Sequence, residues 1–480
     1  MTGAVVGFAI LVLGVFLLLG KVIRVKTSWV QKLFLPSSII AGFIMLALGP
    51  EVLGAIAGLL GFDGLEEAGI FNSQMLEVWS SLPGLLISIV FATLFLGQQL
   101  PSFRRARDLA GPQLSFGIAL GSGQYVIALL LTVAVLVPLF NATPIVGALL
   151  EIGFEGGHGT AAGMGPTLTE LGFEDGGDLA LGIATVGVVG GIMIGILLIN
   201  WGVRTGRTRI ITGSADLSIE EQKGLFREDE HHPAGELTSR PASVEPLSLH
   251  VAIVALSILL GWLLLQGLQL IEQAVWADTI EIFEFVPLFP LAMLGGVVVQ
   301  LAAERMGAGP LIDHQIMLRI QGLALDFLIV SALATLSLTA IGANIGPFLI
   351  LCLAGIVLTV GLLLLLAPRI IPDYWFERGI GDFGQSMGVT ATGLILMRIV
   401  DPDAESPAFE AFGYKQLVFE PFFGGGLVTA ASVPLIFEFG PYPLLIGMSV
   451  LFVVAIGLGL FFYGGAAKEA RAKEKETAAA

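Results

Sequence analysis

Two polar, glycine-rich stretches interrupt an otherwise apolar chain: GFEGGHGTAAG from Gly153 to Gly163, and GDFGQSMGVTATG from Gly381 to Gly393. They stand at corresponding places in the two halves of the sequence. Inside a bilayer, a helix-poor segment is tolerated only where protein or a water-filled cavity satisfies its backbone N–H and C=O groups. Broken segments at matching positions of two halves are typical of transporter binding sites. The two stretches therefore predict a membrane transporter with one re-entrant hairpin in each half.

The composition also indicates a membrane protein. Hydrophobic residues make up 55% of the 480 residues and charged residues only 13%, whereas a soluble domain carries about 25% charged residues. Stretches long enough to span about 30 Å of hydrocarbon predict an all-α polytopic protein of about 11 transmembrane helices. They cover Ala4–Gly20, Leu33–Leu48, Leu82–Gly97, Pro112–Phe140, Asp178–Trp201, Leu247–Ile271, Phe285–Leu301, Leu323–Ile341, Gly346–Ala367, Gln416–Phe437 and Tyr442–Tyr463.

The basic residues predict the orientation, because Lys and Arg concentrate in cytoplasmic loops. We assume an outside N-terminus, one crossing per apolar stretch, and hairpins that return to the side from which they entered. All 23 Lys and Arg residues then fall on the cytoplasmic side. The C-terminus is then cytoplasmic, the first hairpin enters from outside and the second from inside. Opposite entry is what an inverted repeat requires.

The same reading divides the chain into five parts. We expect an N-terminal transmembrane repeat (1–202, hairpin at 145–168), an acidic cytoplasmic linker loop (203–246), a C-terminal inverted repeat (247–440, hairpin at 379–398), an additional transmembrane helix (441–464) and a charged cytoplasmic tail (465–480).

Several motifs resemble those of the bacterial glutamate:sodium symporters. The segment GGHGT (Gly156–Thr160) and the Val-Gly-Gly step at Val189–Gly191 are similar to that family's first hairpin and the helix after it. The family's second hairpin has the form GHCGFGLGATPTAIANM, and this chain reads GDFGQSMGVTATGLILM, keeping Gly381, Gly384, Gly388, Thr390, Thr392 and Met397. The resemblance implies ten helices in two inverted five-helix halves, a homodimer in the bacterial cell or inner membrane, and Na⁺-coupled uptake of L-glutamate or a similar small anionic amino acid or dicarboxylate.

The chain departs from this pattern in three ways. Glu155 stands where the family has a small hydroxyl residue, Asp382 and Phe383 replace a His-Cys pair, and a helix is added at the C-terminus. The first two changes fall within the hairpins and leave the substrate open, as well as the choice between Na⁺ and H⁺ coupling.

The candidate binding residues are polar groups and glycines of the two hairpins. Glycine lets backbone approach a ligand closely, hydroxyls and free carbonyls replace the water shell of Na⁺, and half-helix N-termini hold a carboxylate. Ionisable residues at membrane depth are functional candidates. The predicted substrate and ion site contains Glu155, Gly156, Gly157, His158, Gly159, Thr160, Asp382, Gly384, Gln385, Ser386, Gly388, Thr390 and Thr392, with Thr160, Ser386 and Thr390 as Na⁺ candidates.

Other readings remain open at this point. Glu155 and His158 in GFEGGHGT are also the acid and base of a hypothetical membrane-embedded enzyme, but no nucleophile or third group accompanies them. A channel, or a proton-coupled transporter of another carboxylate, fits the paired hairpins as well. Glu151, Asp326 and Glu420 are better interpreted as interior pairing partners or interface residues. We predict no catalytic residue, no cofactor besides the coupling ion and no nucleic-acid partner.

Overall fold

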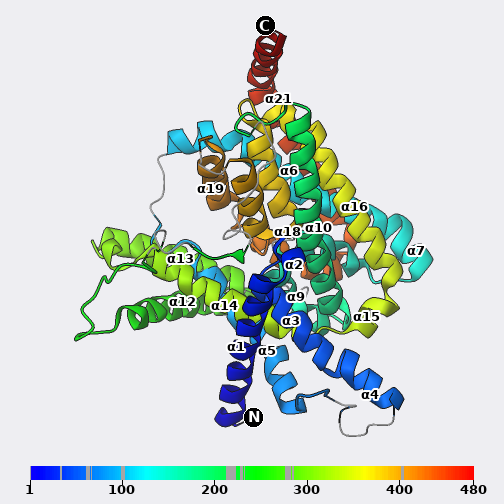
Figure 1. Ribbon diagram of the computed structural model, residues 1–480, viewed down its shortest axis with the longest axis vertical. Helices are drawn as coiled ribbons and strands as arrows, with labels where there is room; N and C mark the ends of the chain where they lie inside the picture. Colours follow the sequence, from blue (N-terminus) through cyan, green and yellow to red (C-terminus); the bar gives the residue numbers. More distant parts are fainter. Residues whose placement is uncertain are drawn as a thin grey trace. The chain divides into compact units, whose positions relative to one another are not determined.

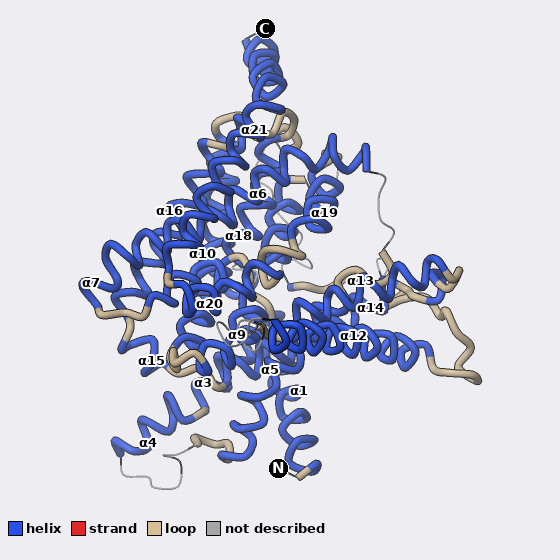
Figure 2. Tube along the Cα trace, turned by 180° about the vertical axis from the view of Figure 1, so that it is seen from behind, coloured by secondary structure: helices blue, strands red, loops and turns tan. Residues whose placement is uncertain are grey.

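The computed structural model describes residues 2–32, 35–60, 65, 68–98, 103–211, 223–226, 231, 233–275, 283, 286–401 and 405–479. These residues form helices and connecting loops, without a strand (Figure 2). Ten of the described helical segments are long and apolar enough to cross a membrane, which confirms the predicted all-α polytopic class. They are Gly3–Lys26, Ser37–Leu60, Ser73–Thr93, Ala110–Phe140, Gly176–Arg204, Pro246–Val275, Leu288–Arg305, His314–Ala334, Ile345–Ile370 and Pro441–Arg471. Part of the predicted linker lies outside the described residues.

One predicted span is wrong. The stretch Gln416–Phe437 is not a single helix, because α19 (Ala408–Phe419) ends there and α20 (Leu427–Phe439) begins after a non-helical segment. Within that segment Gly424 and Gly425 have φ angles of 68° and 108°, which only glycine adopts readily. The helix is therefore interrupted at these residues. The predicted extra C-terminal helix is present as α21 (Pro441–Ala479).

The chain divides into two compact units, each built from both halves of the sequence. Unit 1 comprises 1–99, 158–181 and 218–343, and unit 2 comprises 100–157, 182–217 and 344–480. The helices of unit 1 are α1 (Gly3–Lys26), α2 (Ser28–Lys32), α3 (Ser37–Leu48), α4 (Ala55–Leu60), α5 (Ser73–Thr93), α12 (Pro246–Val275), α13 (Leu288–Arg305), α14 (His314–Ala334) and α15 (Leu338–Ala343), with all but the first residue of α9 (Gly157–Glu170). Those of unit 2 are α6 (Phe103–Leu131), α7 (Val137–Phe140), α8 (Leu149–Phe154), most of α10 (Gly176–Arg204), α16 (Ile345–Leu365), α17 (Ala367–Ile370), α18 (Trp375–Val400), α19, α20 and α21.

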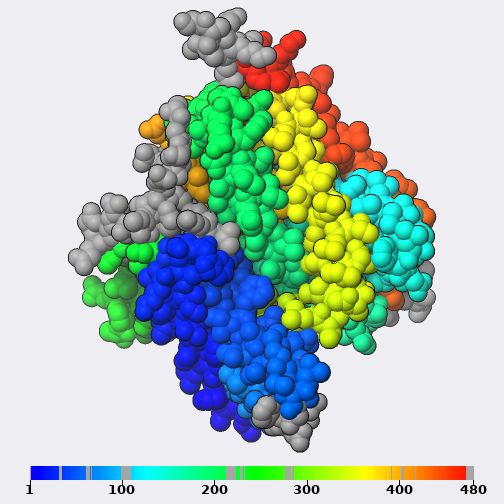
Figure 3. All heavy atoms as spheres, turned by 45° about the vertical axis from the view of Figure 1, so that its right-hand side comes forward, coloured from blue at the N-terminus to red at the C-terminus, as the bar shows by residue number. Residues whose placement is uncertain are grey.

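Unit 1 pairs its helices in a regular way. Helix α1 packs on α3, and both are blue in the space-filling view (Figure 3); α12 packs on α13, and both are green in the ribbon view (Figure 1). Helix α3 contacts α14, α13 contacts α5, and α5 contacts α14. The contacts of α1, α3 and α5 therefore have equivalents among α12, α13 and α14. The α1–α3 contact corresponds to α12–α13, the α3–α14 contact corresponds to α13–α5, and the α5–α14 contact corresponds to itself.

Two apolar cores in unit 1 follow the same pairing. One lies among α1, α3, α5 and α14 and includes Leu13, Met45, Trp79 and Val330. The other lies among α5, α12, α13 and α14 and includes Val254, Val299 and Met317. Side chains also fix where the central helices begin: Asn72 accepts a hydrogen bond from Met75 N of α5, and Asp313 accepts one from Ile316 N of α14, both at 2.8 Å. Such N-caps satisfy an N–H group that the helix itself leaves unpaired.

Unit 2 contains a helical hairpin at the second glycine-rich stretch. The helical angles of α18 are interrupted at Gly388 and Val389, and Val389 has φ 67° and ψ 167°. The two limbs then run back along each other, because Gly384 lies against the backbone of Gly393 and Gly381 against the side chain of Met397. Glycines therefore permit the close approach of the limbs.

Candidate functional site

Three helix breaks meet in unit 2. The first break is 155–156, between α8 and the first residue of α9, Gly157; the second is 388–389, within α18; the third is 420–426, between α19 and α20. A Cβ atom at Gly157 would collide with the Val389 side chain, so the first two breaks touch. A Cβ atom at Gly424 would lie 3.3 Å from the Glu155 carbonyl oxygen, which places the third break beside the first.

Glu151 joins the first and third breaks. This fully buried side chain on α8 accepts hydrogen bonds from Tyr125 Oη at 2.7 Å, Gly424 N at 2.9 Å and Thr429 Oγ1 at 2.8 Å. A buried carboxylate is stable when its lone pairs are satisfied in this way. The expectation that Glu151 is an interior pairing partner is confirmed. Its hydrogen bonds hold the first and third breaks together.

The first limb of α18 carries a buried polar row beside α6 and α19. Lys415 of α19 donates a hydrogen bond to Gln385 Oε1 at 2.6 Å and lies 3.5 Å from Asp382 Oδ1. On the other side, Gln124 of α6 donates to the backbone oxygen of Ser386 at 2.6 Å. Lys415, Asp382 and Ser386 are all completely buried. The row therefore brings a cation, a carboxylate, a hydroxyl and amides together away from solvent.

Glu155 is the carboxylate of this group that forms neither a hydrogen bond nor an ion pair with the described residues. Its side chain is only 3% exposed, and neither carboxylate oxygen accepts a hydrogen bond from any described residue. Ser386 and Lys415 are close enough to interact with it. Within the described residues, Ser386 Oγ, Gln124 Oε1 and both Asp382 carboxylate oxygens also lack hydrogen-bond partners, although Asp382 forms an ion pair with Lys415 at 3.5 Å. We call these three groups, the Glu155 carboxylate, Ser386 Oγ and Gln124 Oε1, the Glu155 site.

The hydroxyls of the second limb of α18 are already engaged. Thr390 Oγ1 donates to Glu420 Oε1 at 3.0 Å and accepts from Gln416 Nε2 at 2.8 Å. The expected pairing of Glu420 is thereby confirmed. Thr392 donates to the backbone oxygen of Gly388. These threonines hold α18 to the third break and close its turn, so they have less capacity for an ion than Ser386 has.

The structure divides the predicted site residues between the units. Glu155, Gly156, Gly157 and every predicted residue of the second hairpin belong to unit 2, whereas His158, Gly159 and Thr160 belong to unit 1. In unit 1, a Cβ atom at Gly159 would lie 3.0 Å from Ile87 Cδ1 of α5. His158 and Thr160 are buried. The boundary between the units thus passes through the first hairpin.

The sequence interpretation missed Lys415 and the third break. The orientation prediction places Lys415 at the cytoplasmic side with every other Lys and Arg residue, yet its side chain is 0% exposed. Its neighbours carry a signal: Phe412 and Phe419 stand three residues before it and four after it, on one helix face. Its Nζ lies 3.8 Å from the ring centre of Phe419 and 5.7 Å from that of Phe412. For the third break, the signal is the Gly424–Gly426 run inside an aromatic segment.

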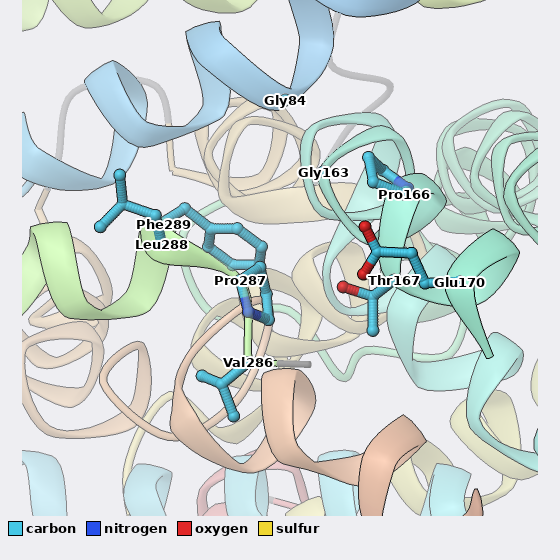
Figure 4. Close-up of a pocket in the computed structure, with 9 residues that line it drawn as sticks. All are labelled: Gly84, Gly163, Pro166, Thr167, Glu170, Val286, Pro287, Leu288 and Phe289. Carbon is cyan, nitrogen blue, oxygen red and sulfur yellow. The ribbon is translucent and has the colours of Figure 1, made fainter. Parts of the chain in front are cut away.

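A separate pocket lies in unit 1 (Figure 4). Glu170 and Thr167 of α9 face Val286 and Pro287, which precede α13, across a volume of about 190 Å³. This is below the roughly 300–1,000 Å³ of typical ligand pockets. No predicted site residue lines it, so we do not assign the binding site there.

The oxygen groups in unit 2 are suited to a light cation more than to a transition metal. Within the described part of the chain, no group of three or more His, Cys, Asp or Glu residues is arranged to hold a metal ion. Carboxylate, hydroxyl and carbonyl oxygens at helix breaks are the ligands that transporters offer to Na⁺.

A family model described as sodium/glutamate symporter matches residues 5–401, which include both glycine-rich hairpins. A comparison with curated protein sequences finds no match. Helices α19, α20 and α21, and with them Lys415 and the third break, lie beyond the matched residues.

Proposed function

The chain belongs to the sodium/glutamate symporter family, and from this premise we propose that it couples Na⁺ entry to the uptake of L-glutamate or a similar small anionic amino acid or dicarboxylate. The family is one of transporters, and ten long apolar helices fit a multi-pass membrane protein. The proposal assigns Na⁺ as the coupling ion and requires no catalytic residue.

One observation carries the proposal: the carboxylate of Glu155 is buried without a hydrogen-bond partner among the described residues, where three helix breaks meet. An isolated buried carboxylate is strongly unfavourable unless a cation or a proton accompanies it. Ser386 Oγ and Gln124 Oε1 add uncharged oxygens. Together these groups suit Na⁺, while the N-terminal ends of helices next to the breaks suit the substrate carboxylate.

The helix pairing in unit 1 supports the inverted repeat. Among the six helices α1, α3, α5, α12, α13 and α14, each contact made by the first three has an equivalent made by the last three. Two equivalent three-helix pieces are expected to pack in this way. Transport would then follow from movement of one part of the molecule against another around the hairpins. A homodimer is part of the proposal on family resemblance alone, and the mass of the purified protein in detergent tests it.

Transport into proteoliposomes tests the function. We expect an inward Na⁺ gradient to drive accumulation of one member of a panel of amino and dicarboxylic acids, and K⁺ in place of Na⁺ to abolish it. Glu155→Gln should abolish concentrative uptake more than it weakens substrate exchange, since exchange does not require the empty carrier to reorient. Glu438→Gln is the matched control, because Glu438 is exposed at the end of α20.

Two results would contradict the proposal. Accumulation that is unchanged without Na⁺ would exclude Na⁺ coupling. Concentrative uptake by Glu155→Gln at the level of the control would remove Glu155 from the coupling site.

A further inference from the structure

Lys415 is a buried cation in the middle of the polar row of unit 2. Its side chain and that of Asp382 are both 0% exposed, and the Nζ to Oδ1 distance is 3.5 Å. The ammonium group also donates to Gln385 Oε1 at 2.6 Å and lies over the ring of Phe419. Burial of a charged lysine is costly unless an opposite charge and hydrogen bonds compensate for it. Asp382 is therefore the partner that makes a charged Lys415 tolerable.

The other charged groups around this row have partners of their own. Glu151 accepts three hydrogen bonds, and Glu420 accepts one from Thr390 and one from Gln416 at 2.7 Å. Arg378 is within electrostatic range of Asp382, but its Nη1 lies 2.6 Å from Asp373 Oδ1. The Lys415–Asp382 pair is neutral as a whole. Glu155 is also near Lys415 and Ser386, but Lys415 is already paired with Asp382, so Glu155 has no cation of its own.

We propose that Lys415 is a tethered cation that permanently occupies the place of one coupling ion at Asp382, so that the carrier takes a single mobile Na⁺, at Glu155. The inference rests on the proposed Na⁺-coupled function and deepens it by fixing how many ions the site binds. An ammonium group is a compact, strongly hydrated point charge, and among oxygen ligands it replaces a monovalent metal ion charge for charge. Two buried carboxylates without Lys415 would call for two mobile cations.

The number of bound Na⁺ ions is measurable without transport. A ligand that binds only the folded protein raises its stability with the logarithm of ligand concentration, and the slope reports how many ions bind. We would measure the thermal unfolding of the full-length protein in detergent over a series of NaCl concentrations, at constant ionic strength with choline chloride and at fixed pH. Wild type should show a slope of one ion, and Glu155→Gln should show none.

Variants of the pair then separate the tethered cation from a structural ion pair. Lys415→Gln should double the Na⁺ slope, because Asp382 now requires its own ion, and Lys415→Gln with Asp382→Asn should return it to the wild-type value. Asp382→Asn alone should abolish the slope, because the released ammonium group neutralises Glu155. Lys468→Gln is the matched control, since Lys468 is exposed on α21.

The outcomes distinguish this inference from the proposed function. If wild type shows neither a Na⁺ slope nor Na⁺-driven uptake, the proposed function fails. If wild type responds to Na⁺ but Lys415→Gln or Asp382→Asn keeps the wild-type slope, the tethered cation is overturned and the function stands. Should Lys415→Gln fail to fold, Asp382→Asn alone decides, because only a lysine charge that stands in for a coupling ion predicts loss of the Na⁺ response when its carboxylate partner is removed.

Discussion

Gly157→Ala tests the contact between the first two helix breaks. Gly157 has φ 66°, and a Cβ atom there would collide with the Val389 side chain. A left-handed conformation costs a non-glycine residue about 1–2 kcal/mol, and an extra methyl in a packed site about 1–3 kcal/mol. We therefore expect Gly157→Ala to lower the free energy of unfolding, measured by SDS titration in mixed micelles, by about 2–5 kcal/mol.

Two other glycines separate these contributions. Gly172 has φ 80° with open space around it, so Gly172→Ala should show only the conformational part, about 1–2 kcal/mol. Gly165, within α9, has neither a positive φ nor a neighbour within 4 Å, so Gly165→Ala should be neutral or stabilising. Gly157→Ala combined with Val389→Ala should recover the packing part, relative to Val389→Ala alone. If the loss at Gly157 is no larger than that at Gly172 and is independent of Val389, the two breaks do not touch.

Three further predictions address the pairing of Glu151, the packing of unit 1 and the topology. Glu151→Ala leaves three donors unpaired and should lower the free energy of unfolding by at least about 3 kcal/mol in the same SDS titration. Glu151→Gln keeps an acceptor for Gly424 and Thr429 and should lower it by only about 1 kcal/mol. Equal losses in the two variants would exclude the hydrogen-bond network around Glu151. Gly295→Ala should destabilise the protein by about 1–3 kcal/mol, because the new methyl meets the backbone of Ser257 in α12. Gly267→Ala is the control and should not destabilise it, because no atom lies within 4 Å of the new methyl. Comparable unfolding midpoints for the two variants would refute the close packing of α12 on α13. In a variant lacking Cys352, a cysteine at exposed Ile70 should react with an impermeant maleimide on intact cells, and one at exposed Leu237 only after permeabilisation; the reverse pattern would overturn the orientation predicted from Lys and Arg.

The sequence was sufficient for the features that depend on local composition. Long apolar runs predict ten of the helices, since a span needs only length and hydrophobicity. The breaks at Gly157 and at Gly388 were also predictable, because glycine-rich polar segments do not continue a helix within hydrocarbon. The third break escaped because Phe422, Phe423 and the glycines after them read as apolar, although Gly424 and Gly425 take left-handed angles.

Features that depend on distant contacts were not predictable from one sequence. Lys415 resembles any basic residue at the end of a helix, and its burial is evident only once Asp382 and Gln385, 33 and 30 residues earlier, are placed beside it. The hydrogen bonds to Glu151 join residues as far apart as Tyr125 and Thr429. The boundary between the two units, which falls between Gly157 and His158, likewise depends on contacts with distant residues, and no local sequence pattern marks it.

The helix pairing in unit 1 joins helices that the ribosome makes at different times. Helix α5 ends at Thr93, but its partner α14 begins only at His314. At about 5–20 residues per second, the ribosome needs roughly 10–45 s to make the intervening chain. During that interval the faces of α3 and α5 that pack on α14 and α13 have no protein partner from the second half, so lipid or the insertion machinery must cover them. The packing of unit 1 is therefore incomplete until helices from the second half of the chain have been made.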